Sequence, residues 1–164
     1  MAFVVAWLMN VLGAVPGVSS ITNLTWYGVG QWQLNVFGFF GMAMFGAIYH
    51  IMPQVAGIEW PCIKSVRRHY WLAALGIILI VLPLAIGGII QGFNWANPKI
   101  SNVDVAKNAL HFLRISTLGE LLILVGNLML LGNLIGLSVR YCKTHFVPVY
   151  KEVTTELNPA EAKR

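Results

Sequence analysis

Charge is scarce in this chain. Lys, Arg, Asp and Glu together make up 10% of its 164 residues, whereas hydrophobic residues make up 57%. This balance excludes an ordinary water-soluble domain and is typical of an integral membrane protein that folds as one compact bundle. The net charge of +5 does not indicate a nucleic-acid partner, because most of the basic residues flank long apolar runs, where they set the orientation of a membrane protein.

Cysteine and histidine are also few. The two cysteines, Cys62 and Cys142, belong to no CxxC or Cys/His cluster, so we assign them no role. No two of the four histidines have the spacing of metal ligands within one helix, and we expect no metal site in the chain. Each histidine is instead expected to be a polar residue near a membrane interface. They are His50, His69, His111 and His145.

Long runs without charge dominate the sequence. About 20 apolar residues are enough to cross a bilayer. Four runs predict spanning helices, at about residues 2–18, 31–52, 71–90 and 113–139. The first run is marginal in length, and Pro83 predicts a kink in the third. The fold class that we expect is an all-α integral membrane protein, a four-helix transmembrane bundle over residues 1–140 in a lipid bilayer. A polar cytoplasmic tail over residues 141–164 follows.

The basic residues predict the orientation of the bundle. One side holds Lys64, Arg67, Arg68, Arg140, Lys143, Lys151, Lys163 and Arg164, and the other side holds Lys99, Lys107 and Arg114. Because cytoplasmic loops carry the excess of Lys and Arg, we expect both termini to lie in the cytoplasm.

Small residues interrupt the apolar body of the second run. They are Gly38, Gly41, Ala43, Gly46 and Ala47. Their mixed spacing of three and four residues lets another helix approach the backbone closely. We therefore predict that this helix is the most enclosed of the four, with Gly38, Gly41 and Gly46 against protein. Gly132 and Gly136 form a GxxxG pair in the last run and predict a further packing contact.

The stretch FGFFGMAMFGAIYHIMP and the later IIQGFNW resemble subunit I of heme-copper oxidases. The resemblance is closest to cbb-type cytochrome c oxidases and more distant to nitric oxide reductases. In that family the corresponding central helix opens with a His-x-His motif. Two residues along a helix turn by about 200°, so one imidazole ligates the low-spin heme and the other the active-site heme. The resemblance begins at Met1, covers roughly the last third of a subunit I, and places Gln31 and Gln33 at the two histidine positions.

The resemblance implies a function without heme chemistry in this chain. Glutamine offers a neutral amide, whereas heme iron is held by His, Met, Cys or Tyr. We therefore expect a non-catalytic, accessory subunit of a respiratory heme-copper oxidase-type complex in the bacterial cytoplasmic (inner) membrane. Heme b and copper would reside in partner subunits, which are other integral membrane proteins including a heme-bearing subunit I. The family also has a His and an Arg near the hemes, and His111 with Arg114 is the best candidate for that pair.

Two alternatives stay open. The chain could be the C-terminal piece of a split catalytic subunit I of a cbb-type oxidase or nitric oxide reductase, completed by another chain. It could also be an unrelated four-helix membrane protein, although a correspondence that runs through several helices in order argues against chance.

One acid, Glu120, falls inside a predicted span. An intramembrane carboxylate is a functional candidate by default, and Asn127 lies seven residues on, about 20° away around the helix. With Ser116 and Thr117 a turn earlier, these residues predict a polar stripe that would contact a proton path, a quinone or a basic residue of a partner. The simpler interpretation, which we favour, is a carboxyl near the membrane interface that its neighbours hydrogen-bond.

Overall fold

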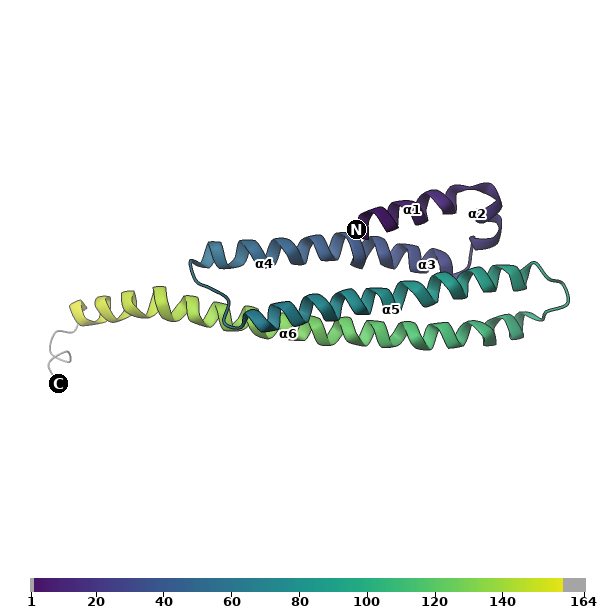
Figure 1. The fold of residues 1–164 in the computed structure, drawn as a ribbon. Helices are drawn as coiled ribbons and strands as arrows, with labels where there is room; N and C mark the ends of the chain where they lie inside the picture. Colours follow the sequence, from purple (N-terminus) through teal and green to yellow (C-terminus); the bar gives the residue numbers. More distant parts are fainter. Residues whose placement is uncertain (1, 158–164) are drawn as a thin grey trace.

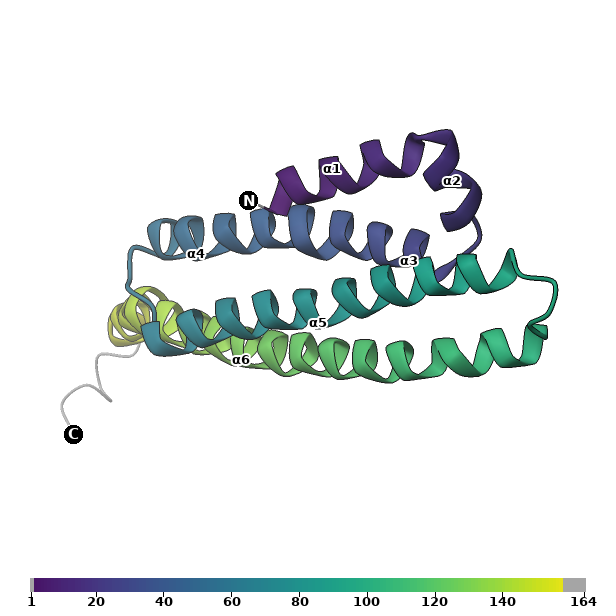
Figure 2. The same ribbon diagram turned by 45° about the vertical axis from the view of Figure 1, so that its right-hand side comes forward.

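The computed structural model describes residues 2–157, and over that range it is helical without any strand (Figure 1). The elements are α1 (Ala2–Ala14), α2 (Pro16–Thr22), α3 (Trp26–Gln33), η1 (Leu34–Gly41), α4 (Met42–Ala56), α5 (Ile63–Trp95) and α6 (Asn102–Leu157). Because α3, η1 and α4 follow one another directly, they form one continuous rod. Three long rods therefore lie side by side, and α1 with α2 covers part of the first (Figures 1 and 2).

The number of membrane spans is three, or four if a bent pair counts as one. The helices long and apolar enough to cross a membrane are Trp26–Ala56, Ile63–Trp95 and Asn102–Thr154. The predicted first span corresponds to α1 and α2, which meet at 95°. Pro16 opens α2, and a proline cannot donate the backbone hydrogen bond that would continue α1. The all-helical membrane architecture is confirmed, whereas an exact count of four spans is not.

The helices α5 and α6 form an antiparallel hairpin that is closest where two glycines cross. A Cβ atom on Gly119 would lie 2.6 Å from the carbonyl oxygen of Gly76, and one on Gly76 would lie 2.8 Å from that of Gly119. From residue 116 on, the buried residues of α6 form what we call the inner seam: Ser116, Gly119, Ile123, Gly126, Leu130, Asn133 and Leu137. Their alternating spacing of three and four residues is the packing pattern of a coiled-coil pair.

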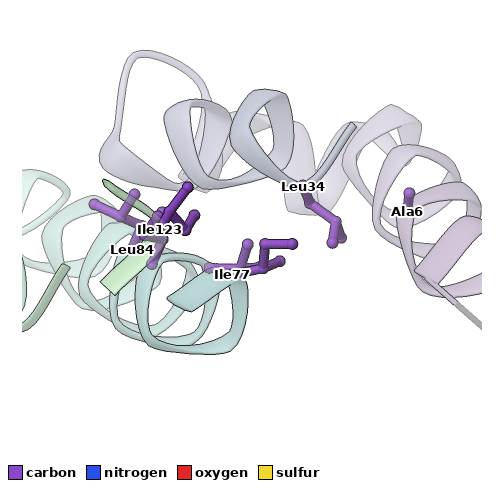
Figure 3. Packing of buried hydrophobic residues seen from close by; sticks show 7 residues of the cluster. Ala6, Leu34, Ile77, Leu84 and Ile123 are labelled. Atoms are coloured by element: carbon purple, nitrogen blue, oxygen red, sulfur yellow. The ribbon is translucent and has the colours of Figure 1, made fainter. Parts of the chain in front are cut away.

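The middle of the first rod, η1, is a π-helix. Such wide turns are rare and often mark functional positions, and the apolar pattern of this run predicts an ordinary α-helix. From η1, Leu34 reaches the apolar core (Figure 3). The core joins α1, η1, α5 and α6 through Ala6, Leu34, Ile77, Ile80, Val81, Leu84 and Ile123.

The last helix, α6, is 56 residues long and runs past the end of α4. Its final part, green-yellow in Figures 1 and 2, projects from the bundle. The part of the predicted tail that the structure describes is thus a continuation of this helix through Leu157.

Candidate functional site

The first polar cluster surrounds Gln31. Its Nε2 atom donates a hydrogen bond to the Oδ1 atom of Asn10 in α1, over 2.5 Å. The Nδ2 atom of Asn10 lies 2.8 Å from the carbonyl oxygen of Ala6 and 3.3 Å from Oδ1 of Asn35 in η1. Side-chain amides that bond between helices stabilise their association in a membrane. Gln31 therefore stabilises the packing of α1 against the rod that contains α3 and η1.

The second glutamine, Gln33, is not part of that cluster. Its Oε1 atom is buried, and no hydrogen-bond partner for it occurs within the described residues. A buried acceptor without a donor costs about 1–3 kcal/mol. Gln33 is the last residue of α3, directly before the π-helix η1. The unpaired oxygen therefore belongs to the residue at the junction of the α-helix and the π-helix.

The residues around Gln31 and Gln33 do not fit an axial heme site. Amides are not among the side chains that hold heme iron, and the Gln31 amide is already bonded to Asn10. The histidines lie elsewhere, with His50 in α4, His69 in α5, and His111 and His145 in α6. Within residues 2–157, no group of three or more His, Cys, Asp or Glu is placed to hold a metal ion.

A buried imidazole, His69, forms a second polar cluster. Its side chain is fully buried. Its Nε2 atom lies 3.1 Å from Oδ1 of Asn127 in α6, and its Nδ1 atom is hydrogen-bonded to the hydroxyl of Tyr49 in α4. Phe45 contacts the ring edge-on, with 4.6 Å between centroids. A neutral imidazole has one donor and one acceptor nitrogen, so this network fits Nε2–H donating to Asn127 and Nδ1 accepting from Tyr49.

The prediction of a polar residue near a membrane interface did not include this burial of His69 between helices. Three helices meet at its ring, and Gly126 lets the ring approach α6, since a Cβ atom there would lie 3.3 Å from the His69 Cδ2 atom.

A third cluster holds the loop between α4 and α5. The buried Asn133 accepts from the backbone N–H of Cys62 over 3.2 Å and donates to its carbonyl oxygen over 3.0 Å. The indole N–H of Trp60 donates to the carbonyl oxygen of Tyr49 over 3.0 Å. These bonds fix the loop against both α4 and α6.

The predicted polar stripe around Glu120 is divided in the structure. Asn127 bonds to His69 and Ser116 is buried in the inner seam, whereas Glu120 is exposed. No hydrogen bond or ion pair joins Glu120 to another residue of the described part. Its neighbour Gly119 crosses Gly76 near the middle of α5. The favoured expectation of a carboxyl near the membrane interface stays a prediction, and within the described residues none of its neighbours bonds it.

The predicted packing glycines have different surroundings. Gly38 is buried, and a Cβ atom there would lie 2.7 Å from Cδ1 of Leu34 and 3.5 Å from Cγ2 of Ile77. A Cβ atom on Gly136 would lie 3.3 Å from Cγ of Pro61. Gly38 thus packs against α5, and Gly136 packs against the loop.

The remaining three glycines have little against them within the chain. A Cβ atom on Gly41 would meet only the carbonyl oxygen of Val36, at 3.2 Å, and one on Gly46 or Gly132 would meet nothing within 4 Å. The most enclosed long helix of the described chain is α5, and not the rod that contains Gly41 and Gly46. Contact of these three glycines with another subunit stays a prediction.

Comparison with known proteins bears on the role of these clusters. The family model described as "Cytochrome C and Quinol oxidase polypeptide I" matches residues 1–122. The Cbb3-type cytochrome c oxidase subunit CcoN1 of Stutzerimonas stutzeri is 31% identical over 83 residues, which cover 50% of this chain and 18% of the relative. The Cytochrome c oxidase subunit 1 homolog of Azorhizobium caulinodans is 29% identical over 127 residues, which cover 73% of this chain and 23% of the relative.

A third relative has a similar identity and a similar coverage. The Cytochrome c oxidase subunit 1 of Rhodobacter capsulatus is 26% identical over 140 residues, covering 80% of this chain and 26% of the relative. The chain therefore spans only 18% to 26% of the length of these three relatives.

Proposed function

The chain belongs to the cytochrome c and quinol oxidase polypeptide I family, and we propose that it serves as a heme-free accessory subunit of a respiratory heme-copper oxidase-type complex. It is a multi-pass membrane protein, with at least three helices that can span a bilayer. Family membership supports a place in membrane electron transport. The chemistry of Gln31 and Gln33 supports the accessory role.

The observation that carries the proposal is the hydrogen bond from Gln31 to Asn10. Heme iron is held by His, Met, Cys or Tyr, and a glutamine amide is not among these ligands. The Gln31 side chain instead donates to a second helix and stabilises packing. If the family resemblance places both heme ligands at Gln31 and Gln33, this chain retains the helix and uses one of those positions for assembly. The loss of both ligands removes both electron carriers, which is expected of a structural subunit.

The partners and the location follow from this role. Heme b and copper would reside in other integral membrane subunits, including a heme-bearing subunit I, in the bacterial cytoplasmic membrane. The excess of Lys and Arg on one side supports a cytoplasmic position for both termini. The exposed Glu120 is the polar group for which a contact with one of those subunits would provide a partner.

A split catalytic subunit I is the second candidate. The observation in its favour is the family match over residues 1–122, which includes most of the described helices. Against it, division of a gene gives no reason to lose ligands, and hemes in such an assembly would need ligands from the other piece.

Optical spectroscopy of the purified chain tests the proposal. We expect no stoichiometric b-type Soret band after expression in heme-replete bacteria and removal of all partners. The matched control is the double variant Gln31→His and Gln33→His, which restores two imidazoles on the same helix. A stoichiometric Soret band in the unaltered chain would overturn the heme-free role.

Deletion of the chain from its native membrane distinguishes the two candidates. An accessory subunit leaves the heme content of each remaining subunit I unchanged, although less complex assembles. A catalytic piece takes the bound heme with it, so the remaining subunits would lose their heme spectrum.

A further inference from the structure

The helix α6 carries a second apolar seam on the side away from α5. Its positions alternate in spacing between three and four residues, and all of them are exposed, whereas the inner seam is buried. We call this seam the outer stripe. It consists of Leu118, Leu121, Val125, Leu128, Gly132, Ile135, Val139, Cys142, Phe146, Val149 and Val153. A sustained repeat of this kind is the signature of a coiled coil.

Lipid can cover only the part of the outer stripe that lies inside the membrane. Asn133 and Gly136 contact the loop before α5, and the basic residues Lys64, Arg67 and Arg68 follow that loop directly, as at a membrane edge. The stripe continues to Val153, about 25 Å beyond Gly136 at 1.5 Å per residue. The end of α4 lies beside α6 as far as Cys142, and beyond it α6 projects without any other described helix of the chain beside it (Figure 1).

The projecting residues of the stripe need another cover. Phe146 is 62% exposed and Val149 is 57% exposed, and a row of such side chains in water indicates an interaction surface. The projecting segment belongs to the same helix as the spanning part of α6, with Pro148 inside it. In Figure 1 it points away from the bundle along the rods and not across them, as a helix bound to the lipid surface would.

We propose that a second copy of this chain covers the outer stripe, so that two α6 helices form a parallel coiled coil that begins in the membrane and continues beyond it. A membrane gives every copy the same orientation. A two-fold axis along the membrane normal therefore brings two α6 helices together in parallel, with equal residues at equal depth. A heptad stripe is complementary to itself under that symmetry.

Five of the eleven residues of the stripe are of the types that favour two strands. Val125, Val139 and Val153 occupy a positions, and Leu121 and Leu128 occupy d positions. Branched residues at a with leucine at d favour parallel dimers.

Gly132 allows a close approach inside the contact, and Arg114 marks one end of it. Gly132 lies within the stripe with nothing within 4 Å of its Cβ position, so two backbones can approach there. Arg114 occupies the d position one heptad before Leu121, where two equal charges would meet, and it therefore marks the end of the interface.

The flanks of the stripe are compatible with a parallel pair. In such a pair each g residue faces the e residue five positions later on the other helix. Ser138 would face Lys143, and His145 would face Tyr150, so no two like charges oppose each other at these pairs.

Disulfide formation through Cys142 gives a direct test, because this native thiol lies at a d position of the stripe and is exposed. The test uses the full chain with Cys62→Ser, in liposomes at a low protein-to-lipid ratio, under mild oxidation. We expect a covalent dimer, since facing d residues come within disulfide reach. The matched control adds Cys142→Ser and Thr144→Cys, which moves the thiol to the opposite face of the same exposed segment. We expect this control to form no covalent dimer. Equal amounts of covalent dimer through the two thiols would overturn the proposal.

The molecular mass in detergent gives a second, independent test. We expect a protein mass of twice the 18.1 kDa chain. Val149→Glu should convert it to the monomer, whereas Thr144→Glu should leave the dimer intact. Both positions lie outside the bundle, so unchanged helicity and melting temperature would show that the fold survives. A monomeric mass of the unaltered chain, or a crosslink that forms only to a different protein, would overturn the proposal.

Discussion

The Nε2 atom of His69 lies 3.1 Å from the side-chain oxygen of Asn127, and this contact joins α5 to α6 inside a membrane protein. The hydroxyl of Tyr49 bonds to the other ring nitrogen, so a single imidazole joins three helices. Because the ring is fully buried, water cannot replace either partner.

We expect His69→Leu to destabilise the chain, because it leaves the Tyr49 hydroxyl and the Asn127 amide without their partner. Leaving a buried polar group unpaired costs about 1–3 kcal/mol. The melting temperature of the purified chain in detergent measures the effect. A double-mutant cycle with Asn127→Leu should give a coupling of about 0.6 kcal/mol and at most about 1.7 kcal/mol. Zero coupling would contradict the hydrogen bond.

The crossing of Gly76 and Gly119 gives a second prediction. Gly119→Ala should destabilise the α5–α6 hairpin, because its methyl group would lie 2.6 Å from the Gly76 carbonyl oxygen. Overpacking of this kind costs about 1–3 kcal/mol. Gly46→Ala is the matched control, since nothing lies within 4 Å of that position. Thermal unfolding of both variants is the measurement, and equal melting temperatures would disprove the close crossing.

The amide cluster of α1 gives a third prediction. Asn10→Leu removes the acceptor of the Gln31 amide and should loosen α1 from α3. Amide hydrogen exchange should become faster in residues 2–14 and stay unchanged in α5. The control is Ser20→Ala, which removes only an exposed local hydrogen bond to the carbonyl oxygen of Gly17. If exchange in α1 is the same in both variants, Gln31 does not hold this helix.

Most of the helical architecture could be predicted from the sequence, because long apolar runs have few other solutions in a bilayer. The hydropathy of the runs did not predict how the helices are aligned along their axes. The structure pairs Gly76 with Gly119 and Gly87 with Phe112, which places the predicted span 71–90 beside an earlier part of α6 than the predicted span 113–139. Glycine contacts determine this register, and an apolar run carries no information about them.

The candidate site was predicted less well, for a related reason. Tyr49 and His69 lie near the ends of two consecutive runs and on either side of the α4–α5 loop, so an antiparallel hairpin brings them together. Spacing rules within one helix cannot detect such a pair. The same rules joined Asn127 to Glu120 on one face, whereas the structure shows Asn127 bonded to His69 and Glu120 exposed.

Glu120 separates the two candidate functions. It lies inside a predicted span, next to the glycine that crosses Gly76, exposed and without a bond to any other described residue. An ionised acid at the centre of a spanning helix costs about 2.5 kcal/mol or more. In the assembled complex this carboxyl should therefore be protonated, or paired with a donor on another subunit.

Replacement of Glu120 by glutamine distinguishes a structural contact from a proton path. Glutamine keeps the size and hydrogen-bonding capacity of the side chain but cannot take up and release a proton. For an accessory subunit, we expect Glu120→Gln to assemble normally with turnover of the complex nearly unchanged, whereas Glu120→Leu should reduce assembly because the partner's polar group loses its contact. Oxidase activity per assembled complex is the measurement. If a fully assembled Glu120→Gln complex lost most of its turnover, the carboxyl would belong to a catalytic proton path and the accessory role would be wrong.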